Sequence, residues 1–505
     1  MNGKAWRRAR QLTQIISTAL FFLLAAFTYR GTAWLLPADF FFRLDPLLAA
    51  TASLAARTLM TTFLLSLFLL ALGWVFGRVW CGWLCPLGAV LDWITPRAPH
   101  KMEMHPQWRR FKYALLVIIL IAALLGNLTL LVFDPLTLLN RTFAAAFVPA
   151  LNVLLVQAET FLYAFAPAQP VIDALENNLR GTALPAQQTF YNLGALFAIL
   201  FAGVVALNWV ASRFWCRYVC PLGAVYALEA RVAFIKPHAA TDCNHCAVCM
   251  RVCPTGAIAV KKDGLHVDPA ECVMCMDCVA ACPSSVVQFK RGASAAAEPA
   301  PALTRREALG SLALGVAGVA LLSSAPAARR DYAHLIRPPG AGADFLSQCI
   351  RCGECVRVCP TGGLQTTFSE AGIVSLWTPN LVPRLGYCDF SCSACGQVCP
   401  TGAIPLLSLA QKRETKIGTA YLDTNRCLPY ATNTPCIVCE EMCPLSPKAI
   451  SLDEVQVTQA DGERIVLQRP RIDHARCIGC GICEYQCPQT GPAAIRVYVT
   501  TALPG

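Results

Sequence analysis

The chain has 505 residues, of which 55% are hydrophobic and only 14% are charged. This composition excludes an ordinary soluble globular protein. Because the apolar residues concentrate in the N-terminal half, it indicates a membrane protein with a soluble portion. The formal net charge of +11 does not indicate a nucleic-acid-binding protein, because the basic residues flank apolar segments and form no stripe interleaved with aromatic residues.

Four apolar segments predict membrane-spanning helices, at residues 11–29, 58–76, 111–133 and 192–210. The loop between the second and third segments carries six basic residues from Arg78 to Lys112, whereas the longer segment between the third and fourth carries only Arg141 and Arg180. By the positive-inside rule, the N-terminus, this basic loop and the region after the fourth segment are expected in the cytoplasm.

A further apolar segment covers residues 144–165. It could be another span, but an even number of extra crossings would then be needed to keep the charge pattern. We therefore expect an interfacial helix there.

The membrane half contains an internal repeat. Val79–Val90, with the sequence VWCGWLCPLGAV, matches Phe214–Val225, with the sequence FWCRYVCPLGAV, and an Asp-Pro-Leu precedes each copy, at Asp45 and Asp134. The repeated unit is span, Asp-Pro, span and Cys-x3-Cys-Pro. A parallel repeat of this kind is expected to pack about an axis along the membrane normal, which brings equivalent ends together.

The Cys-x3-Cys-Pro pairs contribute Cys81 and Cys85 from the first copy and Cys216 and Cys220 from the second. Their i, i+4 spacing predicts both thiols of a pair on one helix face, with the proline ending the preceding geometry. Three interpretations stay open. The four cysteines together hold one cluster at the membrane face, they act as redox dithiols or a transient metal site, or their role is structural.

Two kinds of charged residue accompany the repeat. Arg78, Arg213 and Arg217 lie beside the cysteine pairs and would stabilise thiolates or an anionic cluster. Asp45 and Asp134 each precede a proline, which is the N-cap and N1 signature of a helix start. A role as proton acceptors at a membrane face is compatible with capping and stays open.

Cysteine is the most informative residue type: of 28 in the chain, 24 fall into six four-cysteine motifs and four form the two pairs. These spacings are typical of metal-ligating thiolates and not of a disulfide framework. Two motifs after the fourth span have the Cys-x2-Cys-x2-Cys-x3-Cys-Pro spacing of bacterial-type ferredoxins, in which the fourth cysteine ligates the neighbouring cluster. On that rule the expected ligand sets for two [4Fe–4S] clusters are Cys243, Cys246, Cys249 and Cys282, and Cys272, Cys275, Cys278 and Cys253. Zinc is the alternative, but zinc sites usually place two cysteine pairs around a longer insert.

Four more motifs follow in the C-terminal part. They are Cys349, Cys352, Cys355 and Cys359; Cys388, Cys392, Cys395 and Cys399; Cys427, Cys436, Cys439 and Cys443; and Cys477, Cys480, Cys483 and Cys487. The second and third are widened at their first gap but keep the Cys-x2-Cys-x3-Cys-Pro core, so four further cubanes are expected. Their pairing stays open between first with second and third with fourth, or the nested alternative. Between the last two motifs, alternation over Val455–Gln468 with Asp461-Gly462 predicts a hairpin.

The stretch Leu303–Ala325 divides the two groups of motifs and follows a linker at Arg291–Ala302 that is rich in small residues and proline. Arg305 and Arg306 precede an uncharged run of about 18 residues, which as a helix is roughly 27 Å long, just enough to cross a bilayer core of about 30 Å. The arginine pair and the weak hydrophobicity resemble a twin-arginine export signal. The Ala-Pro-Ala at 325–327 also permits cleavage, and we expect a retained anchor.

No catalytic constellation competes with electron transfer. The sequence has no Ser/His/Asp set, no phosphate-binding loop and no nicotinamide or flavin fingerprint. The seven histidines are scattered, and His245, inside the first motif, is most simply a loop residue. Haem is not expected, because the predicted spans hold no axial-ligand pairs of histidine and the chain has no Cys-x2-Cys-His.

The chain resembles two known protein types joined end to end. Residues 1–289, with four predicted spans, two Cys-x3-Cys-Pro motifs and two ferredoxin motifs, are similar to membrane ferredoxins of the NapH/MauN type. From Thr304 onward, Arg305-Arg306-Glu307-Ala308-Leu309, Arg337-Pro338-Pro339-Gly340, Cys349-Ile350-Arg351-Cys352-Gly353 and Cys477-Ile478-Gly479-Cys480-Gly481 resemble ferredoxins of the NapG/MauM type. This resemblance implies quinol oxidation in the membrane and electron delivery to a periplasmic acceptor, such as a c-type cytochrome that feeds nitrate reductase.

We therefore expect an α-helical membrane domain with two α+β ferredoxin-like modules, one on each side of a bacterial inner membrane. The expected domains are a four-span membrane domain (1–235), a cytoplasmic two-cluster module (236–290), a linker (291–302), a twin-arginine anchor (303–327) and a periplasmic four-cluster module (328–505). Six [4Fe–4S] clusters are expected, with a seventh if the two pairs join, and quinol is the expected substrate. Two alternatives stay open: electron entry from a cytoplasmic ferredoxin, and a redox factor that matures a periplasmic metalloenzyme.

Overall fold

A computed structural model describes most of the chain. The described residues are 3–26, 36–95, 104–180, 185, 187–239, 243, 246–261, 264–283, 286–291, 303–324, 334–368, 370–458 and 464–499. They form two compact units. The first unit comprises 1–26, 34–142 and 196–321, and the second chiefly comprises 143–195 and 322–505.

Helices form at all four segments that the sequence predicts as spans. Their bounds are α1 (Gly3–Ala26), η2 (Thr61–Phe63) with α4 (Leu65–Phe76), α6 (Phe111–Leu124) with η5 (Thr129–Phe133), and α10 (Gly194–Val210). Shorter helices connect them: α2 (Phe40–Arg43), α3 (Pro46–Ala56), α5 (Pro86–Ile94), η4 (Pro106–Arg110), α7 (Pro135–Thr142) and α11 (Pro221–Ala230). Among the described residues, two helices are long and apolar enough to cross a membrane, Gly3–Ala26 and the continuous helix Pro135–Leu162. The number of crossings and their sidedness stay predictions.

Helix α14 (Arg305–Ser324) occupies the twin-arginine stretch. Thr304 and Glu307 form a capping box, because the Thr304 hydroxyl accepts the Glu307 N–H at 3.3 Å and the Glu307 carboxylate accepts the Thr304 N–H at 2.8 Å. A Cβ added to Gly315 would lie 3.1 Å from Ile121, so α14 packs closely against α6. The helix is as expected, and its crossing stays a prediction. The cleavage sequence at 325–327 and nearly all of the linker lie outside the described residues.

A small α+β module ends the helical part of the first unit. It consists of β1 (Ile235–Ala239), α12 (Val248–Val252), β2 (Ile258–Lys261), β3 (Gly264–Val267), α13 (Asp277–Ala281) and β4 (Val287–Arg291). Strand β1 pairs with β4 and β2 with β3, both antiparallel. Ile258, Leu265 and Val287 form its core together with the cysteines Cys249 and Cys278.

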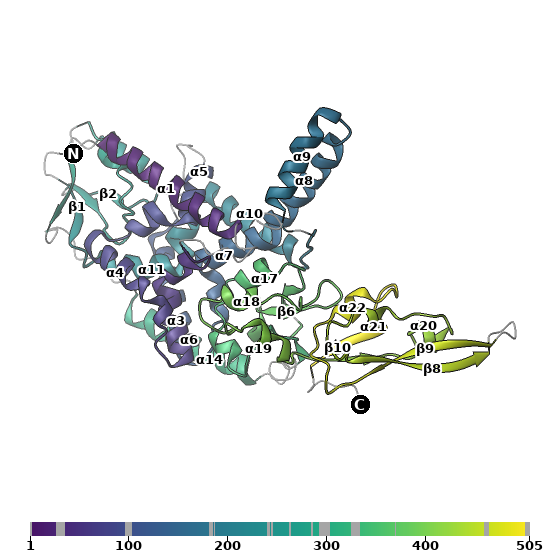
Figure 1. Cartoon of the computed structure of the whole chain (residues 1–505). Helices are drawn as coiled ribbons and strands as arrows, with labels where there is room; N and C mark the ends of the chain where they lie inside the picture. The colour runs from purple at the N-terminus through teal and green to yellow at the C-terminus, as the bar shows by residue number, and fades with distance from the viewer. Residues whose placement is uncertain are drawn as a thin grey trace. The chain divides into compact units, whose positions relative to one another are not determined.

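A helical hairpin opens the second unit. Its elements are η6 (Phe143–Phe147), α8 (Val148–Leu162), η7 (Ala166–Ala168) and α9 (Gln169–Leu179), and α8 and α9 lie side by side (Figure 1). Arg180 ties the hairpin together, since it donates to Asn152 at 2.7 Å and to Glu159 at 2.6 Å. The predicted segment 144–165 is thus helical up to Leu162, and its position at a membrane interface stays a prediction.

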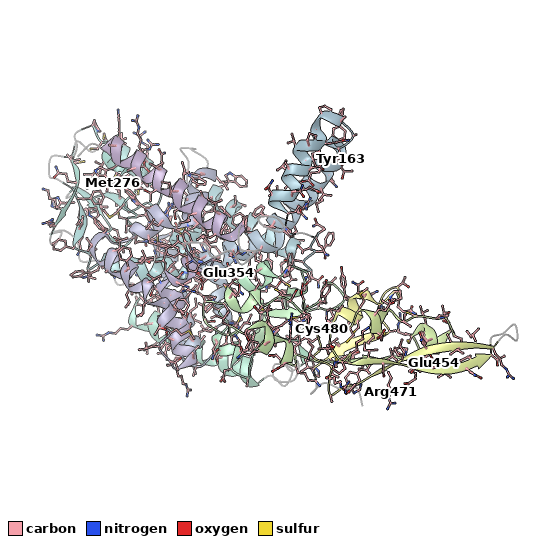
Figure 2. All side chains as sticks on the ribbon, viewed as in Figure 1. Tyr163, Met276, Glu354, Glu454, Arg471 and Cys480 are labelled. Atoms are coloured by element: carbon pink, nitrogen blue, oxygen red, sulfur yellow. The ribbon has the colours of Figure 1, made fainter. Side chains whose placement is uncertain are left out.

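The rest of the second unit is a cysteine-rich α+β module with short elements. Its helices are α16 (Phe345–Gln348), α17 (Glu354–Val358), η10 (Ile373–Ser375), α18 (Ala394–Gln397), α19 (Leu409–Glu414), α20 (Leu428–Ala431), α21 (Val438–Glu441) and α22 (Ile482–Gln486). Its strand pairs, all antiparallel, are β5 (Leu364–Thr366) with β6 (Pro379–Leu381), β7 (Thr419–Leu422) with β10 (Ile495–Tyr498), and β8 (Ile450–Thr458) with β9 (Arg464–Ile472). The long β8–β9 hairpin carries Glu454 and Arg471 (Figure 2) and confirms the predicted hairpin, although Asp461-Gly462 lies outside the described residues.

Candidate cluster-binding sites

Each Cys-x3-Cys-Pro segment forms a single π-helical turn followed by an α-helix. The turns are η3 (Trp80–Leu84) and η8 (Trp215–Val219). Cys85 and Cys220 are the N-caps of the next helices, where each thiol accepts a backbone N–H, from Gly88 at 3.5 Å and from Gly223 at 3.2 Å. The expectation of one α-helix face for both thiols is therefore wrong. The proline starts a new helix at N1, and the cysteine before it is extended.

The two repeats reach across to each other through their arginines. Arg213 donates to the carbonyl oxygen of Cys81 at 2.8 Å, and Arg78 donates to the carbonyl oxygen of Cys216 at 3.1 Å. Each arginine thus fixes the cysteine turn of the other copy. The thiols of Cys81, Cys85, Cys216 and Cys220 are all buried and lie within electrostatic reach of one another. The structure thus brings the two pairs together, as the repeat predicts.

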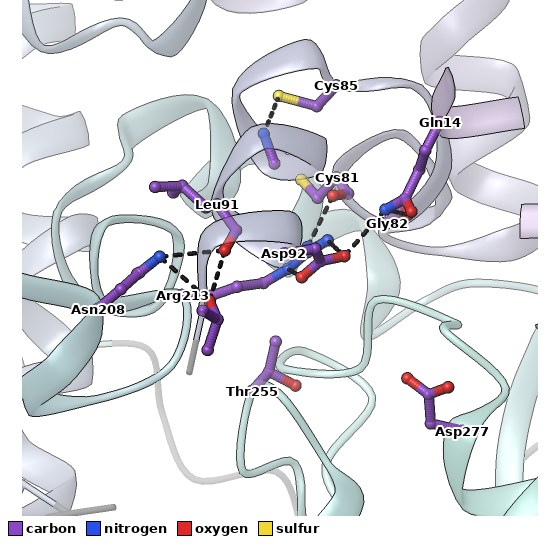
Figure 3. Close-up of polar contacts among 12 residues, drawn as sticks. Gln14, Cys81, Gly82, Cys85, Leu91, Asp92, Asn208, Arg213, Thr255 and Asp277 are labelled. Carbon is purple, nitrogen blue, oxygen red and sulfur yellow. Dashed lines mark hydrogen bonds and ion pairs between the residues drawn. The ribbon is translucent and has the colours of Figure 1, made fainter. Parts of the chain in front are cut away.

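Arg213 is held in place by a polar network (Figure 3). It binds Asp92 with two contacts of 2.6 Å, and Gln14 donates to Asp92 at 2.9 Å and to the carbonyl of Gly82 at 3.0 Å. Arg10 lies 3.6 Å from Asp92. The sequence predicts a role beside the cysteines for Arg213. It gives no such indication for Asp92, Gln14 and Arg10, because they lie outside any motif.

Arg78 and Lys112 meet a carboxylate from the ferredoxin-like module. Glu271 contacts Arg78 at 3.1 Å and Lys112 at 2.6 Å, and all three side chains are at most 3% exposed. Burial alone would raise the pKa of Glu271, but the positive charges of Lys112 and Arg78 hold it below its ordinary value. This ion triad fastens the module to the helical part of the first unit.

The loop between Cys272 and Cys275 lies directly on the first π-helical turn. The indole of Trp83 donates to the carbonyl of Met274 at 2.9 Å. A Cβ added to Gly82 would lie only 2.0 Å from the carbonyl oxygen of Val273, so only glycine permits this approach. The second copy has Arg217 at the matching position, where it is buried beside the Tyr218 ring, 5.2 Å from its centroid.

In all six ferredoxin motifs the third cysteine is the second residue of a short helix, in α12, α13, α17, α18, α21 and α22. In the evenly spaced motifs the residue before this helix is left-handed. These residues are Ala247 (φ 55°), Met276 (φ 62°), Gly353 (φ 83°) and Gly481 (φ 82°). In the two widened motifs the residues at this place, Ser393 and Ile437, have φ of −129° and −123°. The two widened motifs thus lack the left-handed residue before this helix.

The two motifs of the first unit exchange their fourth cysteines. Burial raises the pKa of the Cys249 thiol, and the nearby thiols of Cys243, Cys282 and Cys246 raise it further. Likewise, burial raises the pKa of Cys272 to about 12, and Cys253 contributes in the same direction. These neighbours are those of the two expected ligand sets. His245, expected as a loop residue, lies outside the described residues.

Four hollows in the second unit are each lined by four cysteines. The sets are Cys349, Cys352, Cys355 and Cys399; Cys388, Cys392, Cys395 and Cys359; Cys427, Cys436, Cys439 and Cys487; and Cys477, Cys480, Cys483 and Cys443. The first motif therefore exchanges its fourth cysteine with the second, and the third with the fourth. Of the two pairings that the sequence leaves open, the geometry favours the sequential one over the nested one.

Cys443 and Cys487 each line the hollow of the other's motif. Cys443 ends the third motif in the sequence, but it lines the hollow of the fourth motif, near Cys480. Cys487 ends the fourth motif, but it lines the hollow of the third motif together with Cys436. Burial raises the pKa of Cys427 to about 11, and the thiols of Cys436 and Cys487 contribute in the same direction. The hollows thus group the cysteines across the third and fourth motifs, and iron binding by these cysteines stays a prediction.

The hollows fit a cubane better than a single ion. A zinc ion with Zn–S bonds of about 2.3 Å needs its thiolates nearly in contact, yet no three metal-ligating side chains of the described residues converge on one ion. Several thiols accept backbone N–H groups, as cluster-bound sulfurs do, including Cys399 from Ile404 at 3.4 Å, Cys477 from Ala420 at 3.3 Å and Cys487 from Ala494 at 3.4 Å.

The cysteine-rich module of the second unit contacts the segment that precedes α10. Tyr191 donates from its hydroxyl to the carbonyl of Val356 at 3.2 Å. Gln365 donates to the carbonyl of Phe190 at 3.0 Å and accepts the N–H of Asn192 at 3.1 Å. A Cβ on Gly362 would lie 2.9 Å from Thr189. The sequence carried no signal for this contact.

Asp45 and Asp134 act as helix caps, as predicted. Asp45 Oδ1 accepts the N–H groups of Leu47 and Leu48 at 2.8 and 3.1 Å. Asp134 Oδ2 accepts those of Leu136 and Thr137 at 3.1 and 3.4 Å. Both carboxyl groups are fully buried.

Comparison with known families identifies iron–sulfur domains along the chain. A model of a 4Fe-4S binding domain matches residues 58–112 and 193–237, which contain both Cys-x3-Cys-Pro pairs. One model of a 4Fe-4S dicluster domain matches 242–286, 348–403 and 434–490, and another matches 271–364. The chain thus contains several 4Fe-4S domains. No solved structure matches it.

Individual relatives are ferredoxin-type proteins. The chain is 40% identical over 203 residues to the methylamine utilization ferredoxin-type protein MauM of Methylobacillus flagellatus, covering 39% of this chain and 80% of MauM. It is 35% identical over 187 residues to the ferredoxin-type protein NapG of Escherichia coli, covering 36% of this chain and 77% of NapG. It is also 26% identical over 219 residues to MauN of Methylobacillus flagellatus, covering 42% of this chain and 60% of MauN.

Proposed function

Because the chain belongs to the family of the ferredoxin-type proteins MauM and NapG and is also similar to MauN, we propose that it is a membrane-bound quinol dehydrogenase. It takes electrons from quinol in a bacterial inner membrane and delivers them to a periplasmic acceptor, such as a c-type cytochrome or a reductase. Its cofactors are [4Fe–4S] clusters, which supply one-electron transfer when bound.

The chain provides six complete ligand sets for these clusters. They are Cys243, Cys246, Cys249 and Cys282; Cys272, Cys275, Cys278 and Cys253; Cys349, Cys352, Cys355 and Cys399; Cys388, Cys392, Cys395 and Cys359; Cys427, Cys436, Cys439 and Cys487; and Cys477, Cys480, Cys483 and Cys443. The exchange of fourth cysteines holds both clusters of a pair in one rigid module, so the distance between them is set by the fold.

The observation that carries the proposal is the contact of Gly82 and Trp83 with the loop around Val273. It brings a ferredoxin motif against the membrane-side cysteines Cys81, Cys85, Cys216 and Cys220. We propose these four thiols as ligands of a seventh cluster, which the match of a 4Fe-4S binding domain to both segments supports. Arg78 and Arg213 beside them would offset its negative charge.

We propose opposite sides of the membrane for the two modules, and one packing contact supports the side of the first. The module at 236–290 binds Arg78, Arg109 and Lys112 of the basic loop, which the positive-inside rule assigns to the cytoplasm. The distal module instead binds residues 189–192 of its own unit, and we propose that it lies in the periplasm. Helix α14 would then be the crossing that carries the chain to the periplasm.

Steady-state turnover of the purified holoprotein tests this function. We expect oxidation of a reduced quinone under anaerobic conditions with cytochrome c as acceptor, and loss of that activity in Cys81→Ala. Failure of every quinol to give turnover, together with loss of a partner enzyme's metal centre when the protein is deleted, would instead favour a maturation factor. Reduction only by a cytoplasmic ferredoxin would reverse the proposed entry point.

A further inference from the structure

Two aspartates, one from each repeat, leave an oxygen without a donor deep in the first unit. Asp45 and Asp134 are both 0% exposed. Each uses one oxygen to cap a helix, Asp45 with Oδ1 and Asp134 with Oδ2. The second oxygens, Asp45 Oδ2 and Asp134 Oδ1, find no hydrogen-bond donor among the described residues.

The two carboxyl groups nevertheless lie close enough for a hydrogen bond between them. Ionised carboxylates have only acceptor oxygens, so a hydrogen bond between two of them requires a proton on one. Two negative charges in contact at a buried site would also repel each other strongly, and one shared proton removes this repulsion. Neighbouring Arg141, on α7, donates to the carbonyl of Val132 and lies 3.5 Å from the hydroxyl of Thr137.

A third buried group points to the same place. Tyr226, on α11, is 0% exposed, and its hydroxyl has no hydrogen-bond partner among the described residues. This phenol lies within electrostatic reach of Asp45 and also of Cys81 and Cys85. The phenol thus lies near both the aspartate pair and the thiol site, and its O–H is a hydrogen-bond donor without a partner among the described residues.

We propose that Asp45 and Asp134 share one proton at neutral pH and form a buried proton-binding site between the repeats. The ligand of this site is the proton itself, and the pair carries one negative charge between its two residues. This inference concerns the protonation of the aspartates alone, so it does not depend on which molecule supplies electrons to the clusters.

Infrared spectroscopy of the cluster-loaded protein at neutral pH tests the proposal. We expect a C=O stretch from a protonated carboxyl group, shifted in D2O and lost in both Asp45→Asn and Asp134→Asn. In each variant the asparagine amide donates to the remaining carboxylate, which then needs no proton. Asparagine caps helices as well as aspartate, and unchanged cluster absorbance verifies folding.

Asp39→Asn is the matched control. Asp39 is 1% exposed but contacts Arg43 at 2.8 Å, so we expect it to be ionised and its replacement to leave the band unchanged. Tyr226→Phe should shift the band without abolishing it. A wild-type spectrum without a D2O-sensitive carboxyl band, or a band that survives both asparagine variants, would overturn the proposal.

Discussion

Glu271 is a single buried residue that attaches the module at 236–290 to the helical part of the first unit. It is the only carboxylate that contacts both Arg78 and Lys112 among the described ion pairs, and all three groups are shielded from water. A buried charge with its partner removed is strongly destabilising, even where the intact pair adds little to stability. The module at 236–290 is therefore attached through an interaction that tolerates no loss of charge.

We predict that Glu271→Gln loosens this module from the helical part of the first unit. Two cations would lose their counter-ion, at a cost of about 3–5 kcal/mol. Thermal melting followed through cluster absorbance should show an earlier transition, and limited proteolysis should release the module. Glu307→Gln is the control, because Glu307 contacts Arg110 at 3.0 Å with both side chains partly exposed. Equal stability of Glu271→Gln and the control would contradict the attachment described.

At the residue scale, the sequence identified the cysteines but not all of their partners. The ligand spacing is local, so Cys272 and Cys275 could be found by inspection, whereas the exchange of Cys443 and Cys487 between the last two motifs needed the fold. Glu271 lies 193 positions from Arg78. Contacts at such separations leave no periodic trace in a single sequence, and folding alone brings them together.

At the scale of elements, the conformation of the Cys-x3-Cys-Pro turn is the feature that sequence spacing predicted wrongly. The i, i+4 spacing predicts an α-helical turn, but Cys85 donates its N–H to Trp80, five residues earlier. Pro86 has no N–H and fixes the start of the next helix, so the preceding turn widens. The four evenly spaced ferredoxin motifs are more regular, because in each the left-handed residue after the second cysteine directly precedes a helix.

We predict that Gly82→Ala separates this turn from the loop around Val273. The new Cβ would fall 2.0 Å from a backbone carbonyl, which cannot move aside as a side-chain end can. Rapid-mixing kinetics with quinol should show slower reduction of the ferredoxin clusters with an unchanged cluster content. Gly203→Ala, with nothing within 4 Å of its added Cβ, should keep the wild-type rate. An unchanged rate in Gly82→Ala would rule out this contact as the route.

At the scale of the whole molecule, the sequence predicted the division of the chain better than its packing. The change from apolar spans to cysteine motifs marked both ferredoxin-like parts. The contacts of Tyr191 with Val356 and of Asn192 with Gln365 could not be predicted from the sequence, because residues 187–192 carry no motif. That contact ties the distal module to the segment between the predicted third and fourth spans.

We predict that Arg305→Lys with Arg306→Lys strands the distal module in the cytoplasm. Export of a module that already holds its clusters requires a folded-protein route, and the arginine pair is the proposed signal for it. Protease treatment of spheroplasts should degrade this module in the wild type and spare it in the variant. The same exchange at Arg329 and Arg330, the next arginine pair, should leave accessibility unchanged. Wild-type exposure in the first variant would refute the export signal.

Transfer of electrons from quinol through the membrane to the distal module is the central claim. Proteoliposomes that contain quinol and an external, membrane-impermeant cytochrome c test it most directly. We predict cytochrome reduction that stops when external protease removes the domain after α14, while the clusters of the protected module stay reducible by quinol. Reduction that continues after this domain is removed, or no reduction by any quinol, would contradict it.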